Sequence, residues 1–312
     1  MEIALSVGID TALITLTLAL AAFGLAIIYG LIGVINMGHG AMLTLGAYFT
    51  WAGIDIGVPF VLSVIIAGIL VGIIGTLLEH FIIRHYYDSP FDTLLLTWAF
   101  FLVTTELIKI FFGSDFRTVT NPYPGFIDIG FYKIPTYRTS ISILTAIFIT
   151  ATGFVFLKTT TGIKIRAMIQ NQEVASLLGL NISLTYKMVF GFGCFMAGLA
   201  GGLVAPMLSV SPYMGDMYLV RSFFVVIVGG IGQILSGTIA GSFVIGGLET
   251  IVALFSDQVI AQVAVFLFAI IILRLRPQGC LLYTSPSPRD ATYLVCRLLL
   301  EKKKGGGGGG GG

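Results

Sequence analysis

The stretch GLIGVINMGHGAMLTLGAY, residues 30–48, determines how the rest of the chain is interpreted. Its flanks are apolar, as in a helix that crosses a membrane, but its centre holds Asn36 and His39 among three glycines. An amide and an imidazole in such surroundings need partners, because unsatisfied polar groups are costly inside a membrane. The stretch therefore raises two possibilities: a polar lining on a path through the protein, or a helix break at Gly38 and Gly40 that the two side chains cap or bridge. We favour the break.

The whole chain has the composition of an integral membrane protein. Of its 312 residues, 56% are hydrophobic and 10% are charged, and the mean hydropathy is +1.00, whereas a soluble domain carries about 25% charged residues. Apolar runs of about 20 residues recur, each long enough to cross the hydrocarbon core as a helix. The runs do not alternate polar and apolar residues, so they favour helices over a β-barrel.

We therefore expect an all-α, polytopic membrane protein with eight or nine transmembrane or re-entrant helices. Two of the predicted segments, 40–55 and 219–235, are short or interrupted by glycine, which favours re-entrant or unwound helices there. The nine segments are 12–31, 40–55, 59–82, 92–113, 139–157, 188–209, 219–235, 238–255 and 259–275.

Glycine spacing predicts how some of these segments pack. Gly198 and Gly202 are four residues apart, as are Gly237 and Gly241, and this spacing lets helix backbones approach closely in lipid. We favour such packing over a direct role in a pore. The glycine-rich run at 229–232 favours a break between two helices.

Two polar stretches are long enough to have structure of their own. Residues 114–138 contain three prolines and a Pro-Gly turn signal, which predicts a compact loop with a short hairpin. Residues 158–187 predict short helices, one ending near Gly179 and the next capped by Asn181. Because Lys and Arg are slightly in excess on its side, we expect 158–187 in the cytoplasm, with 114–138 and the N terminus outside.

The last residues, 280–312, do not continue the membrane pattern. The runs LLYTSPSPRD (281–290) and LVCRLLLEKKK (294–304) are interpreted as a translated sequencing adapter, and the eight final glycines as translated poly-G. The alternative is a genuine disordered tail. We assign 1–279 to one transmembrane domain, treat 280–312 as non-native, and expect the natural protein to continue beyond Gly279.

Without that tail the chain is nearly neutral. Five of the 17 basic and two of the 15 acidic residues lie in the tail, so the net charge changes from +2 to −1. This leaves no basic surface for nucleic acid. Cys194 is the one cysteine in residues 1–279, and we expect it to be a small packing residue.

Further polar residues lie within or near the predicted membrane segments. Glu249 follows two glycines deep in its segment, and such an acid is a functional candidate by default. It could equally be structural, paired with Arg221 or hydrogen-bonded to a neighbouring helix. Glu106 and Lys109 are three residues apart and predict a local ion pair. His80 and His85 do not form a cluster with Cys194, so we predict no metal site.

Five motifs, in order along residues 8–279, resemble one family. They are similar to the membrane permease subunits of ABC importers for branched-chain amino acids, urea and related amides. LLLTWAFFLV, VTNPYPGF and SPYMGDMYLVRSFFVVIVGG look closest to the urea branch. The five motifs are YGLIGVINMGHGAMLTLGAY (29–48), TGIKIRAMIQNQEVASLLGLN (161–181), MAGLAGG (196–202), VVIVGGIG followed by GTIAG (225–241), and RPQG (276–279).

The resemblance implies a transport subunit without cofactors, not an enzyme. It implies two cytoplasmic ATPase subunits that hydrolyse ATP, a second homologous permease subunit, an extracytoplasmic substrate-binding protein, and a multi-pass position in a bacterial-type inner membrane. Residues 158–187 would be the region that couples to the ATPases. The coupling residues implied are Arg166, Gln170, Glu173, Ala175 and Gly179. The resemblance does not identify the residues of the translocation path; the candidates there are Asn36, His39 and Glu249, which are polar residues within apolar segments.

Two other classes of function stay open. A stand-alone, gradient-driven carrier or channel for a small polar solute would not depend on residues 163–180. An intramembrane enzyme would use His39 or Glu249, but no GxSxG, HExxH or P-loop motif accompanies them.

Overall fold

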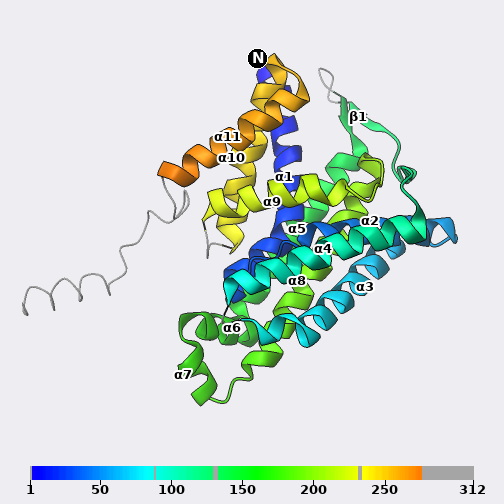
Figure 1. Ribbon diagram of the computed structural model, residues 1–312. Helices are drawn as coiled ribbons and strands as arrows, with labels where there is room; N and C mark the ends of the chain where they lie inside the picture. Colours follow the sequence, from blue (N-terminus) through cyan, green and yellow to red (C-terminus); the bar gives the residue numbers. More distant parts are fainter. Residues whose placement is uncertain (1, 88, 129–132, 231–233, 276–312) are drawn as a thin grey trace, which may run out of the picture.

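The computed structural model describes residues 2–87, 89–128, 133–230 and 234–275, and within them the protein is almost entirely helical (Figure 1). The adapter interpretation of 280–312, the RPQG motif at 276–279 and Gly232 fall outside these residues and stay predictions. The longer helices are α1 (Glu2–Ile32), α2 (His39–Asp55), α3 (Phe60–Phe81), α4 (Pro90–Phe112), α5 (Thr136–Lys158), α8 (Ile182–Val204), α9 (Met214–Gly229), α10 (Ile234–Phe255) and α11 (Gln258–Leu275). The shorter elements are η1 (Ile83–His85), β1 (Phe126–Asp128), β2 (Lys133–Pro135), α6 (Thr160–Gln170), α7 (Gln172–Leu177) and η2 (Ala205–Met207).

Six helices among the described residues are long and apolar enough to cross a membrane. The candidate spans are Val7–Ile32, Phe60–His85, Pro90–Phe112, Thr136–Lys158, Ile182–Met207 and Ile234–Phe255. The second includes the short helix η1 and the fifth includes η2. The expected count of eight or nine is therefore not confirmed. The other three predicted segments form shorter helices: α2 has 17 residues, α9 has 16, and the apolar part of α11 is Gln258–Ile272. A helix of 17 residues is only about 25 Å long, less than the hydrocarbon thickness.

Two central helices form the core. In the most apolar stretches of α1 and α8, 83% of the residues are buried, against 28–44% in the other four spans. Helix α8 packs against α3, α2 and α1, and α1 also packs against α10 and α9. The outer helices expose apolar side chains, as expected for surfaces that meet lipid or another membrane subunit.

Glycines set the spacing between these helices. A Cβ added at Gly46 of α2 would overlap the backbone of Gly198 in α8, and one at Gly201 would overlap the Leu43 carbonyl. The second predicted pair is Gly237 and Gly241 of α10. A Cβ at Gly229 of α9 would overlap the backbone of Gly237, and one at Gly241 would overlap the Val225 carbonyl of α9. The close packing predicted from both glycine spacings is confirmed.

We expect Gly201→Val to separate α2 from α8. The added methyl groups cannot occupy the position of the Leu43 carbonyl, so the backbones must move apart at a cost of roughly 3 kcal/mol. The measurement is the thermal denaturation midpoint of the purified protein in detergent. Gly8→Val is the matched control, because no atom lies within 4 Å of a Cβ at Gly8. Equal midpoints for the two variants would contradict this account of the packing.

Both predicted helix breaks are present, but the first lies earlier than predicted: it covers residues 33–38, and Gly40 lies inside α2. Between α1 and α2 the chain turns at Gly33, whose φ is +80°, and Thr97 of α4 accepts a hydrogen bond from the Met37 amide at 3.1 Å. Helix α9 ends at Gly229, and Gly230 has a φ of +99°. Both positive values lie in the region that glycine adopts most readily.

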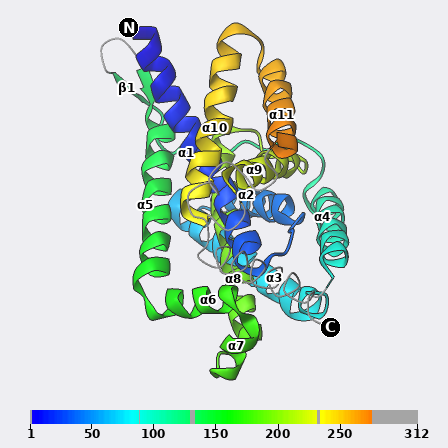
Figure 2. The same cartoon turned by 90° about the vertical axis from the view of Figure 1, so that its left-hand side faces the viewer.

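Helix α5 connects the two polar stretches and holds them at opposite ends of the molecule (Figure 2). The antiparallel strands β1 and β2 precede it, with Phe126 opposite Pro135, so the predicted hairpin within 114–138 is confirmed for its described residues. The short helices α6 and α7 follow it, within 158–187. A helix of 23 residues spans about 35 Å, which is enough to place the two stretches on opposite sides of a membrane.

Candidate functional site

His39, the first residue of α2, connects that helix to α1. Its side chain is fully buried, and Nε2 lies 2.7 Å from the carbonyl oxygen of Ala21 in the middle of α1. Since a carbonyl can only accept, Nε2 carries the proton and donates. This contact supports the bridging role favoured from the sequence over a polar lining.

Asn36 lies within the break between α1 and α2. It too is fully buried, and neither atom of its amide has a hydrogen-bond partner. The space beside it is tight: a Cβ at Gly38 would lie 3.1 Å from Asn36 Oδ1 and 3.0 Å from a ring carbon of Phe100. Asn36 is therefore enclosed by protein rather than set in a wide path.

Glu249 of α10 is part of a buried polar cluster. Only 3% of the residue is exposed, and its Oε1 atom lies 3.0 Å from Arg221 Nη2 of α9. Gln258 of α11 donates a hydrogen bond to the same oxygen at 2.7 Å. Both partnerships considered from the sequence, with Arg221 and with a neighbouring helix, are therefore present.

This cluster lies in the wall of a cavity of about 640 Å³. Helices α1, α9, α10 and α11, which pack against one another, form most of the wall. Helices α10 and α11 meet beside the N terminus (Figure 1). Arg138, at the start of α5, places the cavity at the hairpin end of the molecule. Its polar lining residues are Asp10, Thr17, Arg138, Tyr218, Arg221, Glu249, Thr250, Gln258 and Gln262.

Sequence reasoning missed part of this site. Gln258 and Arg138 were not among the candidates, because each lies at a helix start that reads as a surface position. The available signal was weak. Gln258 follows Glu249 by nine residues, across the turn between α10 and α11, and only the fold brings the two side chains into contact. His39 and Asn36 do not line this cavity.

The predicted coupling residues lie at the opposite end. Helix α7 ends in a Schellman motif, in which the Leu180 amide bonds the Ala175 carbonyl and the Gly179 amide bonds Ser176. Gly179 has the required positive φ, +82°. As predicted, the Asn181 side chain caps α8 by accepting from the Leu184 amide at 2.9 Å.

The side chains of these residues point in different directions. Glu173 is exposed, whereas Ala175 is only 2% exposed and packs inside the chain. Arg166 donates to the Phe156 carbonyl and so ties α6 to the end of α5. The side chain of Gln170 lies outside the described residues.

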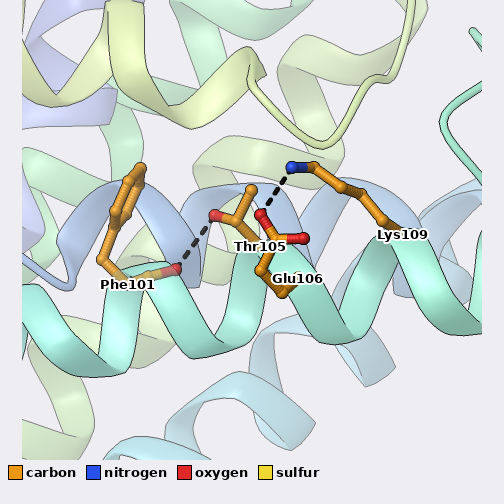
Figure 3. A network of polar contacts seen from close by, with 4 residues as sticks. All are labelled: Phe101, Thr105, Glu106 and Lys109. Atoms are coloured by element: carbon orange, nitrogen blue, oxygen red, sulfur yellow. Dashed lines mark hydrogen bonds and ion pairs between the residues drawn. The ribbon is translucent and has the colours of Figure 1, made fainter.

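The ion pair predicted between Glu106 and Lys109 is present on α4, with Nζ 2.6 Å from Oε1 (Figure 3). The Glu106 side chain is 65% exposed, so the pair is a local surface feature that contributes little to stability.

A second buried acid was not predicted. Glu79 of α3 is fully buried, and the Tyr87 hydroxyl donates to its Oε1 at 2.7 Å. Burial, with this carboxylate beside it, raises the pKa of Tyr87, so the hydroxyl keeps the proton that it donates.

The other predicted features are structural. Cys194 is fully buried, and its Sγ occupies the space that a Cβ at Gly75 would need, so its packing role is confirmed. In the described part of the chain, no three His, Cys, Asp or Glu side chains gather as a metal ion would require.

The membrane spans, the helix breaks and the short helices α6 and α7 extend over nearly all the described residues, and so does one family match. Residues 9–275 match the family described as the permease component of branched-chain amino acid transport systems. The chain belongs to this family. As a member of the branched-chain amino acid permease family, it is a multi-pass protein of the inner membrane.

Several relatives are named as branched-chain amino acid transport permeases. The chain is 26% identical to the high-affinity branched-chain amino acid transport permease LivH of Escherichia coli K12, over 85% of this chain and 91% of LivH. It is 25% identical to BraD of Pseudomonas aeruginosa over the same shares, and 27% identical to a probable LivH of Methanocaldococcus jannaschii over 75% and 76%. No solved structure matches the chain significantly. These relatives support the branched-chain amino acid branch, and the closer likeness to the urea branch is not confirmed.

Proposed function

We propose that this chain is the membrane-spanning permease subunit of an ATP-driven importer of branched-chain amino acids. The family match over residues 9–275 carries the proposal, since it includes both the membrane core and the helices α6 and α7. The partners would be two cytoplasmic ATPases, a second permease subunit and an extracytoplasmic substrate-binding protein. Substrate would cross between the two permease subunits while ATP hydrolysis on the ATPases drives the change between outward and inward access.

The exposed surface of α7 supports a coupling role for 158–187. Leu177 and Leu178 are 82% and 74% exposed, and Glu173 next to them is exposed as well. Large apolar side chains exposed beside the membrane-spanning part favour a protein partner. Because Ala175 packs inward, the proposed docking surface consists of Glu173, Leu177 and Leu178, with Gly179 and Arg166 fixing the orientation of the helices.

Urea or another short amide is the competing substrate. The relatives named above favour amino acids, and the cavity around Glu249 has an ion pair beside aliphatic walls, which suits a charged and apolar solute better than a small neutral one. Glu249 is the residue that we retain as a translocation-path candidate. His39 is proposed to hold the break that positions α2, through its hydrogen bond to the Ala21 carbonyl; the Asn36 side-chain amide makes no hydrogen bond there.

Uptake measurements on the reconstituted transporter test the proposal. Vesicles holding the chain with its ATPases, partner permease and binding protein should accumulate labelled leucine only when ATP is supplied, and should accumulate urea poorly. ATP-dependent uptake of urea but not leucine would overturn the substrate. Uptake by the chain alone, driven by a gradient, would instead favour a stand-alone carrier or channel.

A further inference from the structure

Arg221 and Glu249 are buried charges of opposite sign in the wall of a cavity. Their side chains are only 11% and 4% exposed, and the atoms that face each other are 3.0 Å apart. Charged side chains are expensive inside a membrane protein, and where they occur they are candidates for a functional site by default. A purely structural contact between α9 and α10 would not need charges, because glycine packing at Gly229 and Gly237 already joins the two helices.

The cavity beside the pair has the size and the surfaces for a small amphipathic molecule. Its volume of about 640 Å³ falls within the range of ordinary ligand sites. Leu13, Ile14 and Leu18 of α1 form an aliphatic wall, and Met217 of α9 extends it. Polar groups come from every side of the cavity, and those nearest the pair are Tyr218 of α9, Thr250 of α10, and Gln258 and Gln262 of α11.

We propose that Arg221 and Glu249 form a binding subsite for the zwitterionic head of an apolar α-amino acid. The Arg221 guanidinium binds the substrate carboxylate, and the Glu249 carboxylate binds the substrate ammonium group. The aliphatic side chain lies against Leu13, Ile14 and Leu18. This assignment rests on the proposed function and names the residues that would recognise its substrate.

Charge balance explains why the site can bind and release. Without substrate, Arg221 and Glu249 neutralise each other. With substrate bound, Arg221 pairs with the substrate carboxylate and Glu249 pairs with the substrate ammonium group. No net charge is brought into the membrane or left unpaired, so the uncompensated charge that makes a broken buried pair costly does not arise. Gln258, bonded to Glu249 Oε1 at 2.7 Å, keeps the carboxylate in place during the exchange.

Binding to the complete complex in lipid nanodiscs, without the substrate-binding protein, tests the proposal. The probe is labelled leucine, with three competitors: urea, 4-methylpentanoate, which lacks the ammonium group, and 3-methylbutylamine, which lacks the carboxylate. Unlabelled leucine should compete at least roughly tenfold better than either analogue, because each analogue loses a charge-assisted hydrogen bond. Urea should not compete. Equal competition by leucine and both analogues would overturn the subsite.

A variant supplies the second arm. Arg221→Gln/Glu249→Gln removes both charges and leaves neither unpaired, and we expect leucine binding to weaken by roughly tenfold to a hundredfold. Glu106→Gln, which neutralises the exposed pair of Figure 3, is the matched control and should bind as the wild type does. Unchanged binding by the double variant would overturn the proposal.

The outcomes separate this inference from the proposed function. If the complex takes up leucine with ATP but binds it equally well with and without the two charges, the proposed function stands and the proposed subsite is overturned. So does a complex that transports leucine but shows no binding without the substrate-binding protein. A complex that transports only urea loses the function as well. The analogue comparison uses wild-type protein, so it decides the matter even where the double variant does not assemble.

Discussion

The Gly179→Pro variant is expected to lose ATP-dependent uptake by tenfold or more while its membrane core stays folded. Proline fixes φ near −65° and has no amide hydrogen, but residue 179 has a φ of +82° and its amide bonds the Ser176 carbonyl. Breaking the motif costs about 3 kcal/mol, more than a six-residue helix such as α7 can supply on its own. The surface of Glu173, Leu177 and Leu178 would then no longer be presented to an ATPase.

Gly179→Asn is the matched control, because asparagine visits the left-handed region more readily than other side chains and keeps its amide. It should retain most of the uptake. The readouts are ATP-dependent leucine uptake in vesicles and, separately, the thermal denaturation midpoint of the purified complex. Full uptake by the proline variant would show that α7 does not take part in coupling, whichever substrate the complex transports.

The second large effect is on stability. Arg221→Met leaves the Glu249 carboxylate buried without its counter-charge, and removal of one partner from a buried pair typically costs about 3 to 5 kcal/mol. We expect a clear fall in the thermal denaturation midpoint in detergent. Arg221→Met/Glu249→Gln should recover most of that loss, since the remaining amide is neutral and still accepts from Gln258.

Glu106→Gln is again the control, and it should leave the midpoint close to that of the wild type because its pair is exposed. A single variant as stable as the wild type would mean that water already solvates Glu249. In that case the double variant would recover nothing, and the two measurements together would show it.

Several features could be predicted from local sequence because they depend on local properties. The alternation of apolar runs and glycines predicts membrane segments and breaks, and it identified 40–55 and 219–235 as the unusual ones. Those segments are α2 and α9, which are shorter than a full span. Asn181 and Gly179 act at helix ends as predicted, because capping and a positive φ are properties of a few consecutive residues.

Other features could not be predicted because they depend on which helices meet. The sequence offered Arg221 as one possible partner of Glu249, but Gln258 and the cavity required the approach of α9, α10, α11 and α1. The inward direction of Ala175 was missed for the same reason, since the pattern around it fits a surface helix. The count of spans is not confirmed, because length and hydropathy alone do not distinguish a short buried helix from one that crosses.

The sequence by itself determined that the chain lies in a membrane, where its helices break and which family it belongs to. Hydropathy, backbone preference and the order of motifs are properties of consecutive residues, so they can be recognised without knowledge of the fold. The tertiary structure alone decided that a guanidinium, a carboxylate and an amide from three helices share one cavity wall. In lipid no hydrophobic force selects helix partners, so their meeting depends on close packing at glycines and on polar contacts between distant residues.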